Sequence, residues 1–124
     1  KAVQIGVSAW TAEALKQTLS ASIFSRSTEC HNQDKVSMGT IAARDASRVI
    51  VLTEQVIAAL CCASVQAIHL KDLDGKLAEV LAAFKVWVLQ TFDYVVEDRP
   101  LQHELQQLVD RFENLELLSS ELVR

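Results

Sequence analysis

The sequence predicts an all-α fold built around one long helix. Only three glycines and one proline occur among the 124 residues, so few chain breaks are expected. Alanine, leucine, glutamine, glutamate and valine dominate, and most of these residues favour helix. No stretch alternates apolar and polar residues as a half-buried strand does, apart from a weak hint over residues 22–27. The length predicts a single domain over residues 1–124.

The first helix is expected from Lys1 to about Thr18. Val3, Val7 and Trp10 recur there at the spacing of one helical face. The stretch from Leu19 to Cys30 that follows is rich in serine and has no helical period. Because serine and threonine compete for backbone hydrogen bonds, this stretch is predicted to be an extended loop.

A long helix is expected to begin at Asp34 or Ser37, since either side chain can cap a helix N-terminus. Its second half is apolar nearly all round, which predicts burial on every side. A small domain can scarcely surround such a helix, so partner helices are expected from elsewhere. The predicted inward face consists of Met38, Ala42, Val49, Leu52, Val56, Leu60, Ala63, Ala67 and Leu70.

The rest of the chain reads as two more helices separated by short breaks. Pro100 is well placed as a first helical residue, because its missing N–H costs nothing there. The expected order is a turn over Lys71–Gly75, a helix over Lys76–Val96, a break at Glu97–Pro100, a helix over Leu101–Phe112 and a short turn within Asn114–Arg124.

The charge pattern argues against two classes of partner. The formal net charge is −4, whereas nucleic-acid-binding domains usually carry a basic face. No Lys/Arg cluster longer than a pair occurs, so no polybasic membrane patch is expected. The most apolar stretch, Val56–Ile68, is too short to span a bilayer and predicts a buried helix.

The three cysteines are Cys30, Cys61 and Cys62. An odd number with two adjacent cysteines does not indicate a disulfide framework, so a reducing, cytoplasmic location is expected. Cys61 and Cys62 lie in the most apolar stretch and are interpreted as small core residues. No signal peptide is visible, and the start at Lys1 without a methionine suggests a fragment, a single excised domain or a processed chain.

The polar segment Glu29–Asp34 is the main candidate for function. A metal site is disfavoured, because Cys30, His31 and Asp34 lack the paired ligand spacing that zinc sites show. A Cys30–His31 nucleophile and base is equally disfavoured, since adjacent residues rarely face one another. On composition alone, a polar loop with a helix cap remains the favoured interpretation.

The exact amino-acid sequence of this segment favours a functional interpretation instead. His31-Asn32-Gln33-Asp34, followed by Val36-Ser37-Met38-Gly39-Thr40-Ile41-Ala42-Ala43-Arg44, resembles the aromatic amino-acid ammonia-lyase and aminomutase family. Residues 4–17 upstream and Glu97-Asp98-Arg99 downstream are similar to flanking parts of the family's C-terminal region. The resemblance implies an aspartase-like long-helix bundle whose core is shared by several subunits, a homotetramer in the family.

The resemblance also implies roles for four residues. Gln33 and Glu29 are expected to be catalytic, with the Glu29 carboxylate near the substrate amine. Asn32 and His31 are expected to contact substrate or to support the loop. Histidine ammonia-lyases carry a glutamate in place of Gln33, so the glutamine favours an aromatic substrate such as phenylalanine or tyrosine.

The family's electrophile, 4-methylideneimidazole-5-one (MIO), forms from an Ala-Ser-Gly tripeptide. No Ala-Ser-Gly occurs in these 124 residues, so the chain alone is expected to be inactive. The resemblance therefore implies the C-terminal part of an ammonia-lyase or 2,3-aminomutase that contributes one wall of the active site. The alternative is a non-catalytic helical oligomerisation module from a truncated or degenerate lyase.

Overall fold

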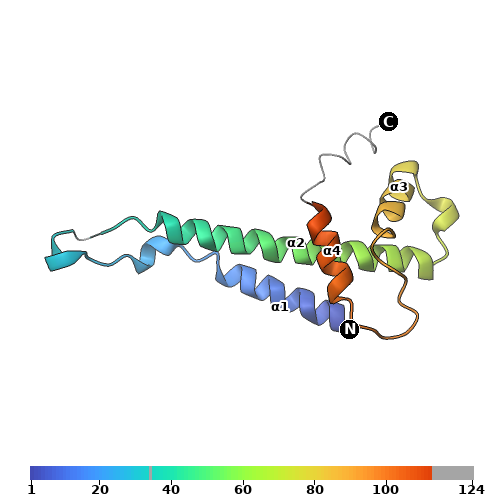
Figure 1. The fold of residues 1–124 in the computed structure, drawn as a ribbon, viewed down its shortest axis with the longest axis horizontal. Helices are drawn as coiled ribbons and strands as arrows, with labels where there is room; N and C mark the ends of the chain where they lie inside the picture. The colour runs from blue at the N-terminus through green and yellow to red at the C-terminus, as the bar shows by residue number, and fades with distance from the viewer. Residues whose placement is uncertain (34, 113–124) are drawn as a thin grey trace. The chain divides into compact units, whose positions relative to one another are not determined.

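The computed structural model describes residues 1–33 and 35–112. Four α-helices and three short 3₁₀ helices make up this part of the chain, and no strand occurs in it (Figure 1). The prediction of an all-α fold is thus confirmed. In order, the elements are α1 (Ala2–Lys16), η1 (Ala21–Phe24), η2 (Glu29–His31), α2 (Gly39–Leu70), η3 (Asp74–Lys76), α3 (Glu79–Val88) and α4 (Gln102–Phe112). The predicted turn within Asn114–Arg124 lies outside the described residues.

The chain divides into two compact units, of which the first is Lys1–Thr53 and the second starts at Glu54. In the first unit, α1 lies alongside the early turns of α2 (Figure 1). Arg48 Nε donates to Glu13 Oε1 at 2.7 Å between these two helices. Both side chains are more than 40% exposed, so the pair contributes at most about 1 kcal/mol. Leu52 and Ala21 are buried, whereas no residue of α1 is.

Helix α2 ends at Leu70 as predicted, but it begins at Gly39 rather than at Asp34 or Ser37. Asp34 is outside the described residues. Ser37 lies just before the helix, where its Oγ accepts a hydrogen bond from the Gly39 N–H at 3.3 Å. Ser37 therefore binds a backbone N–H at the N-terminal end of the helix, as its side chain suggested, from a position outside it.

The predicted inward face of α2 is wrong in its second half. Leu60 and Leu70 are 63% and 72% exposed. The buried positions recur at helical spacing on a different side of the helix. Because this half is apolar nearly all round, its pattern cannot tell which side the partner helices will cover. The buried residues here are Ala58, Ala59, Cys61, Cys62 and Val65.

Helix α3 is much shorter than the predicted Lys76–Val96, because it ends at Val88. The residues that follow have other partners for their backbone groups. The Gln66 side chain accepts from the Val95 N–H at 2.9 Å and donates to the Val95 carbonyl at 3.4 Å. Phe92 is buried at 2% exposure in the loop. A tertiary contact from α2 thus replaces the helical hydrogen bonds that the sequence pattern suggested.

Aromatic residues make up much of the core of the second unit. Trp87 lies between Phe84 and Phe112, with ring centroids 6.3 Å and 6.1 Å away. The Arg111 guanidinium stands 4.4 Å over the Trp87 ring and donates to the Trp87 carbonyl at 2.9 Å. This cation–π contact holds α4 against α3 within the unit. The buried cluster is Ala58, Cys61, Cys62, Val65, Trp87, Val88, Phe92 and Leu108.

Helix α4 matches its predicted range closely, although Pro100 lies before its first residue, Gln102. Leu108 is fully buried, and Leu101, Leu105, Val109 and Phe112 pack against the core as predicted. Arg99 forms an ion pair with Glu104 and donates to the Asp93 carbonyl at 2.6 Å. The charged loop before α4 therefore ties itself to the first turn of the helix.

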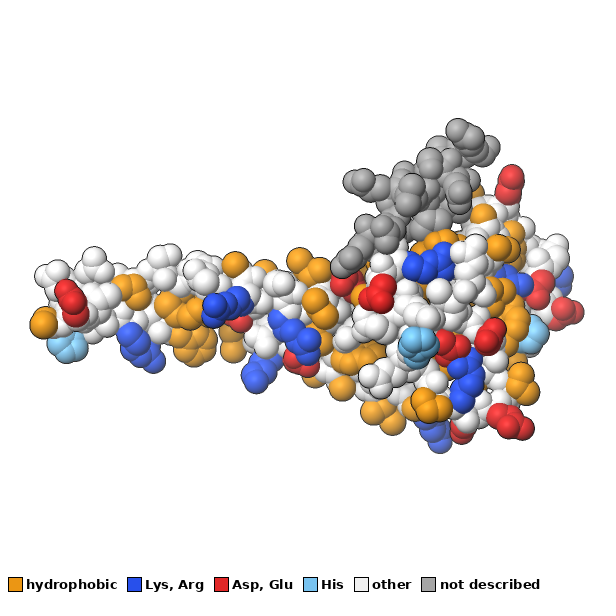
Figure 2. Space-filling view, in the orientation of Figure 1, with side chains coloured by type: hydrophobic (Ala, Val, Ile, Leu, Met, Phe, Trp, Pro, Cys, Tyr) orange, Lys and Arg blue, Asp and Glu red, His pale blue; other side chains and the backbone are white. Residues whose placement is uncertain are grey.

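Many large apolar side chains remain on the surface. Figure 2 shows hydrophobic side chains exposed over both units. On α2 they include Ile50, Ile57 and Leu60, which are 59%, 43% and 63% exposed. Within the described residues, α2 is also long and apolar enough, by length and composition alone, to cross a membrane. That is weak evidence, since core helices of soluble proteins meet the same criterion.

The contrast between Leu108 and Leu70 gives a matched test of the core of the second unit. Leu108→Ala removes a fully buried side chain and should lower the free energy of unfolding by about 2–5 kcal/mol. Leu70→Ala makes the same change at a 72% exposed helical position and should shift it by less than about 1 kcal/mol. Urea denaturation followed by circular dichroism measures both. Equal destabilisation by the two variants would show that the core is misplaced.

The cysteines should differ in reactivity. Burial, with smaller contributions from Cys61 and Glu104, raises the pKa of the Cys62 thiol to about 12, and burial also raises the pKa of Cys61. Cys30 is exposed. Because the thiolate is the reactive form, iodoacetamide at pH 8 should alkylate Cys30 at least about a hundredfold faster than Cys62 in the folded chain. Mass spectrometry after brief labelling measures the two rates, and the urea-unfolded chain, in which both cysteines are exposed, is the control. Equal rates for Cys62 and Cys30 in the folded chain would contradict the prediction.

Candidate functional site

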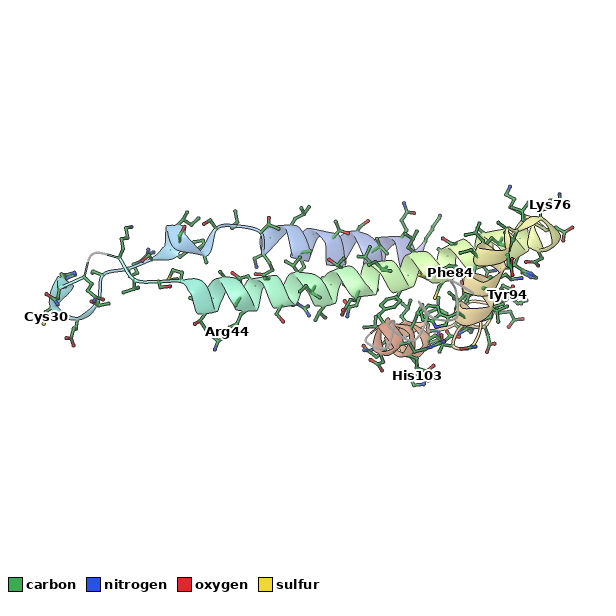
Figure 3. All side chains as sticks on the ribbon, turned by 90° about the horizontal axis from the view of Figure 1, so that it is seen from above. Cys30, Arg44, Lys76, Phe84, Tyr94 and His103 are labelled. Atoms are coloured by element: carbon green, nitrogen blue, oxygen red, sulfur yellow. The ribbon has the colours of Figure 1, made fainter. Side chains whose placement is uncertain are left out.

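The candidate site is the loop that connects α1 with α2. Figure 3 shows this loop extending beyond the ends of the two helices, with Cys30 at its far end. Ser25 closes its base. The Ser25 Oγ donates to the Val36 carbonyl at 2.9 Å and accepts from the Val36 N–H at 3.0 Å. The two arms of the loop are therefore joined at residues 25 and 36 by one side chain.

A second closure lies nearer the tip. The Thr28 N–H donates to the Gln33 carbonyl at 3.1 Å, which forms a closed turn over residues 28–33. Within it, the Asn32 N–H donates to the Glu29 carbonyl at 3.0 Å, as part of the 3₁₀ helix η2. The predicted extended loop is thus partly coiled, because short i→i+3 turns satisfy its backbone groups.

The tip holds two consecutive residues in the left-handed region. Cys30 has φ 50° and His31 has φ 55°. Non-glycine residues adopt such backbone angles at a cost of order 1–3 kcal/mol each, and they persist only where the surroundings restrain them. The hydrogen bonds between residues 28 and 33 and between residues 25 and 36 supply that restraint.

All four residues predicted for the site lie in this closed turn. Glu29, His31, Asn32 and Gln33 are each exposed. His31 Nδ1 is 2.7 Å from the Ser27 Oγ, so the serine fixes one ring nitrogen. The side chains of Glu29, Asn32 and Gln33 are exposed. The turn therefore presents one carboxylate and two amides, which are groups that can bind a polar ligand.

Other residues that could bind a metal or act as a base were sought around this turn. In the described part of the chain, no group of three His, Cys, Asp or Glu side chains could hold a metal ion. His69 lies elsewhere in the fold, stacked on Tyr94 with ring centroids 3.9 Å apart. Asp34, the last residue of the predicted segment, is outside the described residues.

Ser25 is a residue of this loop that the sequence patterns do not single out. It is one of several serines between residues 20 and 27, and nothing in its spacing distinguishes it from Ser22 or Ser27. The structure does distinguish it, because Ser25 is only 7% exposed while both of the others are exposed. A buried hydroxyl needs hydrogen-bond partners, and Val36 provides both.

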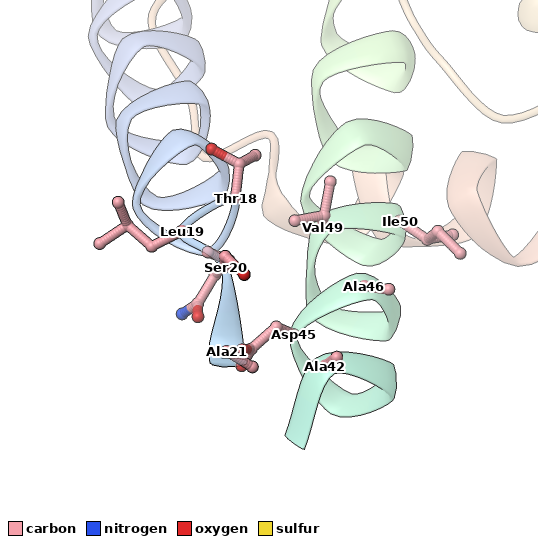
Figure 4. Close-up of a pocket in the computed structure, with 10 residues that line it drawn as sticks. Thr18, Leu19, Ser20, Ala21, Ala42, Asp45, Ala46, Val49 and Ile50 are labelled. Carbon is pink, nitrogen blue, oxygen red and sulfur yellow. The ribbon is translucent and has the colours of Figure 1, made fainter. Parts of the chain in front are cut away.

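A groove of about 510 Å³ lies in the same unit, between the end of α1 and the start of α2 (Figure 4). None of the four predicted site residues lines it. Its walls are mainly apolar, which distinguishes it from the polar turn. The lining residues are Gln17, Thr18, Leu19, Ser20, Ala21, Ala42, Asp45, Ala46, Val49 and Ile50.

Comparisons with known proteins agree on one family. The family model described as aromatic amino acid lyase matches residues 1–87. Histidine ammonia-lyase 1 of Fusobacterium nucleatum is 31% identical over 90 residues, which cover 73% of this chain and 17% of that protein. Histidine ammonia-lyase of Bacillus subtilis is 30% identical over 90 residues, covering 73% of this chain and 18% of that protein.

A solved structure extends the likeness to the fold. The crystal structure of tyrosine aminomutase from Streptomyces globisporus matches with a TM-score of 0.83 and 28% sequence identity. The match covers 94% of this chain and 22% of the aminomutase chain. The chain thus spans less than a quarter of each of these relatives.

Proposed function

This chain belongs to the aromatic amino acid lyase family, and we propose that its polar turn forms one wall of an active site that acts on an aromatic L-amino acid. The complete enzyme would release ammonia to leave the α,β-unsaturated acid, or shift the amine to the β-carbon. The observation that carries the proposal is the closed turn over residues 28–33. It holds a carboxylate and two amides exposed on a restrained backbone.

Glu29 and Gln33 are the two residues to which we assign chemical roles. The Glu29 carboxylate would bind the substrate ammonium group or accept a proton from it. The Gln33 amide would donate and accept hydrogen bonds close to the substrate. Asn32 and His31 would contact substrate or support the turn, and Ser27 would hold the His31 ring in place.

Gln33 also favours one class of substrate. A neutral amide suits a neutral aromatic ring, such as that of phenylalanine or tyrosine, whereas an anionic side chain suits imidazole. The relatives include enzymes named for histidine and one named for tyrosine, so their names do not decide between these substrates. The preference for phenylalanine or tyrosine therefore rests on Gln33.

The proposed cofactor is MIO. The 124 residues contain no Ala-Ser-Gly from which it could form, so it would come from another part of the enzyme. The exposed polar groups of the turn are of a kind that can face such a group from across a site. When present, MIO supplies the electrophile that activates the substrate. The residues of this chain would bind and orient the substrate. By itself the chain is then expected to be inactive.

The exposed apolar surface supports an assembly. On α2, the side chains of Ile50, Ile57 and Leu60 are 59%, 43% and 63% exposed. On α3, those of Val80 and Val86 are 59% and 61% exposed. Covering such side chains is favourable by about 25 cal/mol per Å² of apolar surface. We propose that copies of the protein cover them in a homo-oligomer, a tetramer by analogy with the family. The cysteine pattern supports a cytoplasmic location. The net charge of −4 argues against a nucleic-acid partner, and the lack of a Lys/Arg cluster longer than a pair argues against a polybasic membrane patch.

The role of Gln33 can be tested in the complete enzyme. Gln33→Glu places an anion beside the ring and should lower kcat/KM for phenylalanine or tyrosine by about ten- to a hundredfold. Gln102→Glu makes the same change at an exposed position of α4 and should leave activity unchanged. Release of cinnamate or coumarate, followed by ultraviolet absorbance, measures both variants. No product from either amino acid in the unmodified enzyme would favour the non-catalytic module, and turnover of histidine alone would reverse the substrate assignment.

The assembly proposal predicts that the isolated chain will not remain a monomer. Its exposed apolar side chains should drive self-association at micromolar concentration. Multi-angle light scattering gives the mass directly. The double variant Ile57→Glu, Leu60→Glu should shift the chain toward the 13.7 kDa monomer, because charges on this surface resist burial. A monodisperse, well-folded monomer from the unmodified chain would count against the assembly.

A further inference from the structure

We infer that Ser25 is a positioning residue for the reaction, a latch that holds the Glu29 and Gln33 side chains where they meet substrate. This inference rests on the proposed function of the turn. Ser25 itself lies at the base of the loop, away from the tip, and contributes through the backbone of Val36.

Ser25 makes two hydrogen bonds across the loop with its hydroxyl. Its hydroxyl uses both its donor and an acceptor on a single residue of the opposite arm, at 2.9 Å and 3.0 Å. Its exposure is 7%, so water cannot readily replace these bonds. One side chain thus does what a pair of backbone hydrogen bonds does between adjacent strands.

The neighbouring serines show that this arrangement is specific. Ser22 Oγ is 2.7 Å from Ser20 Oγ on the same arm, and both residues are exposed. Ser27 contacts His31 within the tip. In the described part of the loop, Ser25 is the serine whose side chain joins the two arms. Ser22 is therefore a matched control at a position three residues away.

The latch acts on the turn through a short path. Val36 is three residues after Gln33, and Ser25 is three residues before Thr28. The latch and the Thr28–Gln33 hydrogen bond are therefore successive closures of one loop. The strained residues Cys30 and His31 lie at the tip, beyond both closures. Opening the base releases the restraint that keeps these residues in the left-handed region and lets Glu29 and Gln33 move.

The test compares Ser25→Ala with Ser22→Ala in the complete enzyme. Hydrogen–deuterium exchange of peptides covering residues 26–38 should quicken about tenfold in Ser25→Ala and stay unchanged in Ser22→Ala. The kcat should fall about ten- to a hundredfold in Ser25→Ala, more than KM rises, because misplacement of reacting groups affects the chemical step. Ser22→Ala should keep the melting temperature of the unmodified enzyme, and Ser25→Ala should stay folded with a slightly lower melting temperature, because two buried hydrogen bonds are lost. Ser25→Thr retains the hydroxyl and should restore slow exchange and kcat together.

Ser25→Cys is the second variant. Cysteine is similar in size to serine, but its thiol makes weaker hydrogen bonds. This variant should therefore change the exchange rate and kcat in the same direction as Ser25→Ala. Unchanged exchange in the alanine and cysteine variants would overturn the latch. Faster exchange with unchanged kcat would overturn the positioning role, provided that Gln33→Glu does lower kcat/KM. If Gln33→Glu has no effect on kcat/KM, the proposed function of the turn fails, while the exchange measurement still decides whether Ser25 fastens the loop.

Discussion

The burial of side chains along α2 is the interaction on which both units depend. Near its middle the helix buries Leu52 in the first unit, and farther along it buries Cys61, Cys62 and Val65 in the second. The same helix supplies Gln66, whose side chain binds the Val95 backbone and so allows the chain to leave α3 after Val88. Helix α2 thus supplies Leu52 to the first unit and four of the eight residues of the buried cluster in the second.

The sequence predicted the helices better where one face differs clearly from the others. Leu105, Leu108 and Phe112 recur on an otherwise polar α4, and its range and its inward side were both predicted. In α2 the extent was predicted except at its start, but the inward side of its second half was not, since apolar residues surround it. The end of α3 depends on Gln66, which is far away in the sequence, so no local pattern could reveal it.

The candidate site shows the same division. The amino-acid sequence of residues 31–44 indicated the family, and the family model and the relatives confirm it. The roles of Glu29, His31, Asn32 and Gln33 remain predictions. What the sequence could not indicate is how the turn is held. Ser25 resembles the other serines around it until its burial and its two hydrogen bonds to Val36 are seen.

The structure thus describes a restrained polar turn that exposes Glu29, Asn32 and Gln33, in a chain whose 124 residues contain no Ala-Ser-Gly. The most direct test of its function is the structure of the complete enzyme bound to cinnamate or coumarate. We expect Gln33 or Glu29 within hydrogen-bonding distance of the ligand. A ligand bound elsewhere, with the turn exposed to solvent and remote from it, would contradict the assignment of this turn to the active site.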